Sequence, residues 1–505
     1  MRVGSSGLGF TGSKGVQCGV GRLISSPDGF EVTAGSSALF PCDGLRRDLD
    51  NLLTDILLSA RGRVTAGPVN AVERDEEIAQ ALSGFDFCTP RDMGDILRWV
   101  IARMEGGIVH VDHPRYFGLF NPTPTFPSQC ADRIIAAFNP QLASGTTSPF
   151  PVALEAHVIR ALAGRIGMPS DAAGHFTSGG SEANATAMVC ALTQRDPSFA
   201  RDGSRAFRGQ PKVYVSQDAH LAWLKIAHQT GIGRNAVRLI PTTGAGCMDP
   251  EALAHIIASD AAEGRVPVMV VATAGTTGAG MIDPLADTAR IARAHGAWYH
   301  VDAAWGGALV VSDRWRGVLA GIEMADSITI DAHKWLATTM GCGMFITSRP
   351  SALSAAFYVI MDCMPSNDAK LDPYVTTFQW SRRFSGLRLF LGLAVAGWSG
   401  YAEHVEHSIL VANSLWERLR AQGWCRVNAS PLGVLCLLPP DQDADVRGIV
   451  RAVVDGGTAW ISVVEFAGRP VVRACVTSGE CNESDITMLV EAMCAAARAA
   501  RPSAG

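Results

Sequence analysis

Apolar residues follow two different patterns along the chain. In "LRRDLDNLLTDIL" (45–57) and "DILRWVIARM" (95–104) they recur three and four positions apart, which predicts amphipathic helices. In the middle of the chain, short and nearly continuous apolar runs alternate with helical segments. We expect strands at four of these runs, 212–216, 266–275, 297–304 and 327–331. Buried strands separated by helices predict an α/β fold with a mostly parallel sheet that is covered on both faces.

Two segments between these strands carry helix-boundary signals. "DPEALAHIIASDAAEG" (249–264) and "DPLADTARIARAHG" (283–296) each begin with Asp-Pro and end near a glycine, as capping chemistry favours. In contrast, "HPRYFGLFNPTPTFPSQ" (113–129) holds too much proline for a helix or a central strand, so we expect an ordered loop there.

These changes of pattern divide the chain into four parts. Residues 1–40 form a Gly/Ser-rich start that we expect to be mobile, and residues 41–110 form a helical segment. Residues 111–395 form the large α/β domain. Residues 396–505 combine helices with shorter strands, which predicts a smaller C-terminal α+β domain.

The composition narrows the class of protein. With 505 residues, of which 48% are hydrophobic and 18% charged, the chain can bury a large core. A net charge of −5 without an arginine cluster argues against a nucleic-acid partner. No apolar stretch reaches the ~20 residues that span a bilayer, so we expect a soluble protein that does not enter a membrane. Thirteen scattered cysteines without metal-ligand spacing indicate reduced thiols, a cytoplasmic location and no metal site.

Residues with chemical potential follow the predicted strand ends, where ligands bind to parallel sheets. In "HFTSGGSEANATAM" (175–188) two glycines and a serine open a helix whose N–H groups can hold an anion, although an ordinary serine cap has the same pattern. No glycine motif for a nucleoside triphosphate or a dinucleotide is present. In "YHVDAAWGG" (299–307) Asp302 ends a buried strand and must pair either with a ligand cation or with neighbouring N–H groups.

Three further residues extend this set, and each has a plainer alternative. Lys334 in "DAHKWL" (331–336) is one of only five lysines among 43 basic residues. A desolvated lysine forms Schiff bases with aldehydes, whereas most loop lysines are simply solvated. His220 follows another strand and is either catalytic or a capping residue, and Thr277 lies in a glycine-rich segment that is otherwise a plain turn.

Together these features match the parts of pyridoxal phosphate: its phosphate, ring nitrogen, aldehyde and flat ring. On these motifs the chain resembles the group II pyridoxal-phosphate-dependent decarboxylases, the family of aromatic-amino-acid, glutamate and cysteine-sulfinate decarboxylases. "DAHKWL" and "HVDAAWGG" are specific to that family, and "QWSRRFSGLRLF" (379–390) is similar to its sequence after the catalytic loop. The resemblance runs from about residue 45 to the C-terminus.

The resemblance implies a role for each candidate residue. Lys334 would form the internal aldimine, Asp302 would hold the pyridinium nitrogen, and His220 would stack on the ring and orient the substrate carboxylate. The remaining cofactor-binding residues would be His333, Ala304, Gly179, Gly180, Ser181 and Thr277. The resemblance also implies an aspartate-aminotransferase-type fold (fold type I), an amino-acid substrate, and a homodimer with active sites at the subunit interface.

The chain departs from the family at two positions. Many relatives have Asn where this chain has Asp331, and a carboxylate there would repel the phosphate, so we do not assign Asp331 as a phosphate ligand. By ungapped alignment Cys363 takes the place of a loop tyrosine that protonates the carbanion. A thiol can deliver a proton but is shorter, and Tyr358 or Tyr374 could substitute for it.

The predicted reaction is the decarboxylation of an L-amino acid to an amine and CO2, with Lys334, His220, Asp302 and Cys363 as catalytic residues. The alternative is decarboxylation coupled to oxidative deamination, which gives an aldehyde, or another carbanion reaction, because changes at the loop tyrosine divert the carbanion in this family. A relative that only binds or regulates would be expected to have lost the cofactor residues that are present here. The phenylalanines and basic residues of 113–129 leave both a small acidic and an apolar substrate open.

Overall fold

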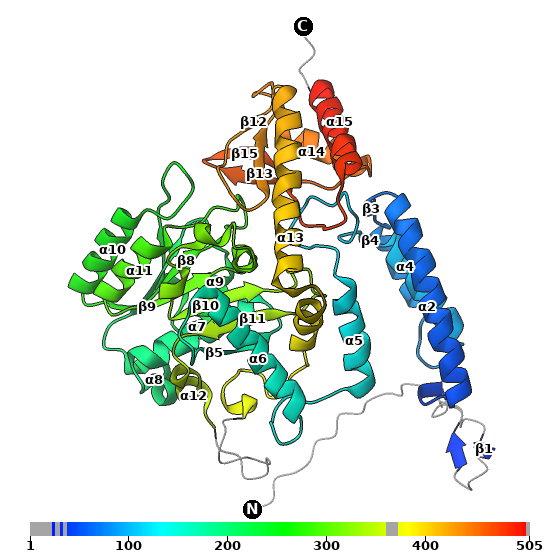
Figure 1. The fold of residues 1–505 in the computed structure, drawn as a ribbon, viewed down its shortest axis with the longest axis horizontal. Coiled ribbons are helices and arrows are strands. Elements are labelled where there is room, and N and C mark those ends of the chain that lie inside the picture. The colour runs from blue at the N-terminus through cyan, green and yellow to red at the C-terminus, as the bar shows by residue number, and fades with distance from the viewer. Residues whose placement is uncertain (1–22, 26–30, 34–37, 360–371, 501–505) are drawn as a thin grey trace, which may run out of the picture. The chain divides into compact units, whose positions relative to one another are not determined.

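The computed structural model describes residues 23–25, 31–33, 38–359 and 372–500 (Figure 1). Cys363 lies outside these described residues. The chain divides into two compact units. The smaller unit contains the chain up to Gly67 together with Ala71–Val109, and the larger contains Pro68–Asn70 and His110–Gly505. Every other candidate residue therefore belongs to the larger unit.

The smaller unit consists mainly of helices. Helices α2 (Asp43–Ala66) and α4 (Met93–Gly106) contain the two segments with helical spacing and confirm both predictions. The carboxylate of Asp92 caps α4 by accepting the N–H of Asp95 at 3.0 Å. The other elements up to Val109 are α3 (Asp75–Ser83) and the strands β1 (Leu23–Ser25), β2 (Glu31–Thr33), β3 (Asn70–Ala71) and β4 (Ile108–Val109).

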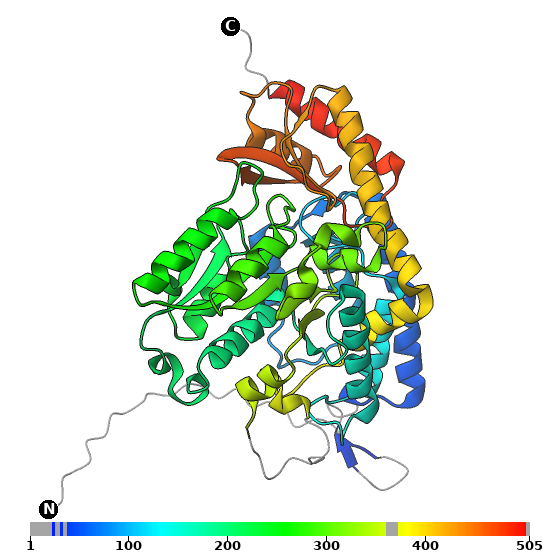
Figure 2. The ribbon, with the colours of Figure 1, turned by 60° about the vertical axis from the view of Figure 1, so that its left-hand side comes forward.

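The larger unit is organised around a seven-stranded sheet with the order β5-β11-β10-β9-β8-β6-β7 (Figures 1 and 2). Only β11 runs antiparallel to its neighbours, so the carboxyl ends of the other strands meet at one edge. The four predicted strands are confirmed as β6, β8, β9 and β10. The strands are β5 (Ala173–Thr177), β6 (Pro211–Ser216), β7 (Val237–Ile240), β8 (Val266–Thr273), β9 (Trp298–Asp302), β10 (Ser327–Asp331) and β11 (Gly343–Thr347).

Helices cover both faces of this sheet, as strands that are apolar on both sides require. Val213 and Val215 of β6 join the buried cluster formed with α7, α9 and α12, whereas Tyr214 joins the cluster formed with α6, α10 and α11. The helices are α5 (Phe126–Phe138), α6 (Pro149–Ile166), α7 (Gly180–Arg195), α8 (Phe199–Asp202), α9 (Ala222–Gln229), α10 (Pro250–Ala262), α11 (Leu285–Ala294) and α12 (Ser351–Phe357).

The expected start of one helix was wrong. Asp249 caps α10 as predicted, but α11 begins at Leu285, two residues after the aspartate of its Asp-Pro pair. Asp283 is buried instead, and its carboxylate accepts the backbone N–H groups of Met248 and Thr273 at 2.7 Å each. This aspartate thus secures the end of β8 rather than a helix.

The expected loop at 113–129 is also too long. Helix α5 begins inside it at Phe126, and Pro127 lies in the first helical turn, where its missing N–H group is not needed. The three phenylalanines of this passage separate: Phe117 is buried in the C-terminal core, Phe126 is exposed, and Phe120 reaches the pocket described below.

The C-terminal part of the larger unit follows a long interrupted helix, α13 (Gly386–Ala421). Gly397 breaks it with a φ of 65°, a conformation that favours glycine. Beyond it a four-stranded antiparallel sheet and two helices enclose their own apolar core. These elements are β12 (Cys425–Arg426), β13 (Val434–Leu438), α14 (Val446–Asp455), β14 (Ser462–Phe466), β15 (Arg469–Cys475) and α15 (Glu483–Ala499). Among the described residues no helix is long and apolar enough to cross a membrane.

Candidate active site

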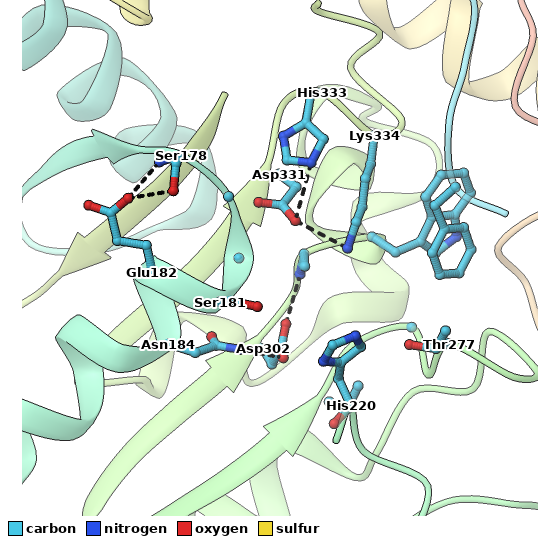
Figure 3. A pocket seen from close by; sticks show the side chains of 17 residues that line it. Ser178, Ser181, Glu182, Asn184, His220, Thr277, Asp302, Asp331, His333 and Lys334 are labelled. Atoms are coloured by element: carbon cyan, nitrogen blue, oxygen red, sulfur yellow. Dashed lines mark hydrogen bonds and ion pairs between the residues drawn. The ribbon is translucent and has the colours of Figure 1, made fainter. Parts of the chain in front are cut away.

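A pocket of about 290 Å³ opens at the carboxyl ends of β5, β6, β8, β9 and β10 (Figure 3). The structure brings together in it every residue assigned a cofactor-binding role: Gly179, Gly180, Ser181, His220, Thr277, Asp302, Ala304, His333 and Lys334. Tyr358 and Tyr374 do not line it. Cys363 lies outside the described residues, so its position relative to this pocket stays a prediction.

The first turn of α7 forms one wall of the pocket. Gly179 is the N-cap residue and has no side-chain cap, so the helix presents backbone N–H groups and its positive dipole end to the pocket. A Cβ atom on Gly180 would lie 2.9 Å from Asp331 Oδ2, which explains why a glycine stands there. The Ser178 hydroxyl and N–H group donate to Glu182 Oε2 at 2.6 and 2.8 Å and hold the turn before the helix (Figure 3).

Lys334 lies in the turn that follows β10. Its ammonium is 3.1 Å from Asp331 Oδ2 and 5.7 Å from the centre of the Phe120 ring. The Lys334 side chain is 24% exposed, whereas that of Asp331 is 3% exposed. Lys334 is thus accessible from the pocket, and its ion-pair partner is a buried carboxylate.

Asp302 ends β9 and is buried on the floor of the pocket. Its Oδ2 accepts the amide of Asn184 at 2.8 Å, and its Oδ1 accepts the N–H of Ala304 at 3.2 Å. This environment suits an ionised carboxylate, which only accepts hydrogen bonds. Asp302 is thus one of the carboxylates that line the pocket, held in place by these two donors.

Asn184 was missed by the sequence analysis, although its motif was recognised. Its amide oxygen accepts the hydroxyl of Thr329 at 2.6 Å and Nε2 of His300 at 3.1 Å, so its NH2 group must point to Asp302. Burial lowers the pKa of His300 to about 4 and keeps the ring neutral, while the Ser327 hydroxyl lies 2.8 Å from Nδ1. His300 therefore holds Asn184 by a hydrogen bond, and Asn184 in turn positions the Asp302 carboxylate.

Three candidates lie near the pocket mouth or beside Lys334. His220 is exposed, and its Nδ1 accepts the N–H of Ala222 at 3.1 Å, which leaves Nε2–H for a ligand. Thr277 is exposed and points into the pocket (Figure 3). His333 is buried, and its Nδ1 accepts the N–H of Cys342 at 3.3 Å.

Phe120 and Trp305 line the remaining wall, and Trp335 and Arg473 are buried in contact with these two rings. Phe120 stacks on Trp305 with ring centres 4.2 Å apart, and Trp305 stacks on Trp335 at 4.5 Å. The guanidinium of Arg473 lies 4.7 Å from the Phe120 ring centre, and its Nη2 has no hydrogen-bond partner among the described residues. These contacts place a fixed aromatic face, with a cation close to it, beside Lys334.

Most of the pocket fits pyridoxal phosphate. The uncapped start of α7 with its two glycines suits the phosphate, Asp302 suits a protonated ring nitrogen, and Lys334 suits the aldehyde. Asp331 is the exception, because its carboxylate faces the same helix start. No group of three or more potential metal-ligating side chains occurs in the described part of the chain.

Comparison with known proteins agrees with this geometry. The sequence model of one protein family, the pyridoxal-dependent decarboxylase conserved domain, matches residues 89–435 of this chain. The chain is 32% identical over 329 residues to an L-2,4-diaminobutyrate decarboxylase of Acinetobacter baumannii, covering 62% of this chain and 64% of that enzyme, just under two thirds of its length. It is 25% identical to an aromatic-L-amino-acid decarboxylase of Bacillus atrophaeus over 85% of this chain and 90% of that one. The crystal structure of mouse CSAD in apo form superposes with a TM-score of 0.84 at 25% identity, over 90% of this chain and 99% of the other.

Proposed function

The chain belongs to the family of pyridoxal-dependent decarboxylases, and on that premise we propose that it converts an L-amino acid to the corresponding amine and CO2. It is a carboxy-lyase of fold type I whose cofactor is pyridoxal phosphate. The bound cofactor supplies an electron sink for the pair of electrons released when the carboxyl group leaves. The observation that carries the proposal is the meeting of Lys334, Asp302 and the start of α7 in one pocket.

Lys334 is the residue that holds the cofactor aldehyde through its amine. Only a lysine serves there, because an arginine guanidinium stays protonated and cannot act as the nucleophile. The amine lies 5.7 Å from the centre of the Phe120 ring, and its side chain is only partly exposed, so one side of it is apolar.

Asp302 holds the proton on the cofactor ring nitrogen. The Asn184 amide and the Ala304 N–H fix both carboxylate oxygens, which supports the charge and the direction of this side chain. Gly179, Gly180 and Ser181 would bind the phosphate at the start of α7, and Ala304 would pack against the ring.

The histidines and Thr277 contact the cofactor and the substrate. His220 would stack on the ring and would orient the substrate carboxylate with Nε2–H, which its Nδ1 contact leaves available. His333, next to Lys334, would lie near the phosphate, and Thr277 would contact the polar edge of the ring, since both line the pocket.

The substrate side chain packs against Phe120. Phe120 and Trp305 both line the pocket, and the Arg473 guanidinium lies 4.7 Å from the Phe120 ring centre, so the pocket offers apolar surface with a buried cation close by. The named relatives act on a diamino acid and on aromatic amino acids, and a ring backed by a cation favours an aromatic or anionic side chain over a cationic one.

Cys363 protonates the carbon that loses the carboxyl group. Its thiol has a reference pKa of about 8.5, low enough to release a proton at neutral pH. The proposal rests on its place in the sequence, since it lies outside the described residues. Amine is the expected product.

The enzyme is a cytoplasmic homodimer. Large apolar side chains on α5, α6 and α13 are exposed in the single chain, including Phe138 (81%), Phe150 (67%) and Val395 (74%). An apolar cavity of about 230 Å³ between α6 and α13 lies among the same helices. A second copy is the partner that would cover such a surface. The cytoplasmic location rests on the thirteen scattered cysteines of the sequence.

Substitution of Lys334 tests the cofactor assignment. Lys334→Arg is expected to abolish both turnover and the absorbance of covalently held cofactor, while pyridoxal phosphate still binds reversibly. Retention of both signals by the variant would contradict the proposal.

A further inference from the structure

Asp331 is a carboxylate where the proposed function needs space for a phosphate. Its Oδ2 faces the first turn of α7, so closely that a Cβ on Gly180 would lie 2.9 Å away. Its Oδ1 is buried and has no hydrogen-bond partner among the described residues. The side chain is therefore not turned away from the phosphate cradle, and one of its oxygens still lacks a donor.

The surroundings of Asp331 hold one strong cation. Lys334 Nζ lies 3.1 Å from Oδ2, whereas His333 Nε2 lies 3.9 Å away, too far for a hydrogen bond. Once the Lys334 nitrogen is attached to the cofactor aldehyde it is no longer a free ammonium with three N–H donors, so Asp331 would lose this ion-pair partner in its present form.

No other charged group in the described structure replaces Lys334. From α7, the Glu182 carboxylate is turned to Ser178 and Gln379. From β9, Asp302 is a second anion. From β11, Gly343 carries no side chain, and burial raises the pKa of the preceding Cys342 thiol to about 12, so this group stays neutral.

We propose, on the basis of the function above, that Asp331 takes up a proton when pyridoxal phosphate is loaded and then donates its O–H to the phosphate. Two changes drive this step in the same direction: Lys334 is no longer a free ammonium beside Asp331, and a doubly negative group arrives beside a buried carboxylate. A neutral carboxyl group has one O–H donor and one acceptor oxygen, and the O–H suits a neighbouring phosphate oxygen, which accepts hydrogen bonds. Asp331 is then a cofactor-binding residue whose protonation sets the pH dependence of loading.

The test counts the protons exchanged on loading. Apoenzyme is titrated with pyridoxal phosphate by calorimetry in buffers of different ionisation enthalpy, for the wild type and for Asp331→Asn. Both proteins attach the cofactor through Lys334, so the difference between their proton counts reports on Asp331, and the infrared difference spectrum assigns the proton to its carboxyl group. We expect the wild type to take up about one more proton per site than the variant, so that the ratio of their affinities changes about tenfold per pH unit.

Asp260→Asn is the matched control. Asp260 has the same 3% side-chain exposure and is also ion-paired, with Arg238 at 2.7 Å, but it lies on α10 and does not line the pocket. This variant is expected to keep the wild-type proton count.

A second measurement needs no affinity. The infrared difference spectrum of the wild type on loading should contain the carbonyl band of a protonated carboxyl group, and Asp331→Asn should lack it. Equal proton counts and no such band, with normal loading, would overturn the inference about Asp331 alone. Failure of the wild type to bind pyridoxal phosphate at all would instead overturn the proposed function.

Discussion

Asn184 is the residue whose replacement most directly tests how the site is held in place. It is 2% exposed and links three groups: it donates to Asp302 and accepts from Thr329 and His300. Asn184→Ala removes all three contacts and leaves three buried polar groups without these partners. A hydrogen bond to a charged group contributes about 1.5–3 kcal/mol, and each unsatisfied buried group costs about 1–3 kcal/mol.

These magnitudes give two separate expectations. The apoenzyme should lose about 2–4 kcal/mol of unfolding free energy, since the individual terms do not add fully. Because Asp302 loses the donor that directs it, the dissociation constant of pyridoxal phosphate should rise about 10- to 100-fold. Guanidinium unfolding measures the first effect, and quenching of tryptophan fluorescence on cofactor titration measures the second.

Asn428→Ala separates the two effects. Asn428 is 4% exposed and also has three hydrogen bonds, to Ala279, Val434 and Cys436, but none of these partners lines the pocket. This variant should lose a similar unfolding free energy and keep its cofactor affinity within about threefold. Equal cofactor affinities for the two variants would refute the positioning role of Asn184.

Three further predictions concern other residues. Gly180→Ala should weaken cofactor binding about tenfold or more in the same titration, because its Cβ would lie 2.9 Å from Asp331 Oδ2; unchanged affinity would contradict the tight cradle. Burial lowers the pKa of the His175 side chain from its ordinary value of 6.5 to about 3 in the folded protein. Between pH 6.5 and 3 the unfolded chain binds a proton at this residue and the folded protein does not, so the free energy of unfolding falls as the pH drops. His175→Leu should therefore raise the free energy of unfolding by about 2–3 kcal/mol relative to the wild type near pH ~4, which would lower the pH midpoint of acid unfolding. The same midpoint in both proteins would count against this. Cys363→Ala should slow amine formation about 10²-fold or more, as measured by single-turnover product analysis. A wild-type rate in this variant would mean that another group donates the proton.

The sheet and its active edge could be predicted because local sequence specifies them. The run 327–331 contains three successive β-branched residues and then turns polar, so both the strand and the position of Lys334 can be read from the chain itself. The start of α7 was readable for the same reason, since its glycines and serine are neighbours in sequence.

The support behind the site could not be predicted in this way. Asn184 meets His300 across 116 residues of sequence, a contact that only the packing of α7 on the sheet creates. The period of two in β9, which places His300 and Asp302 on one face, was the only available signal. Loops lack such a period, so sequence alone did not distinguish Phe120 in the pocket from Phe117 in the C-terminal core.

Asp331 shows the same limit. The sequence revealed a carboxylate close to the expected phosphate, but its direction depends on contacts with Gly180 and Lys334 from two different segments. Only the fold shows that it faces the cradle.

The most direct test of the central claim is the product formed from carboxyl-labelled L-amino acids. Purified enzyme with pyridoxal phosphate would be given a panel of acidic, aromatic, aliphatic and basic substrates, with labelled CO2 and the organic product followed together. We expect labelled CO2 and an equal amount of the matching amine from at least one substrate, and neither from Lys334→Arg. Release of CO2 with an aldehyde and ammonia, or no CO2 from any substrate by cofactor-loaded enzyme, would contradict the account.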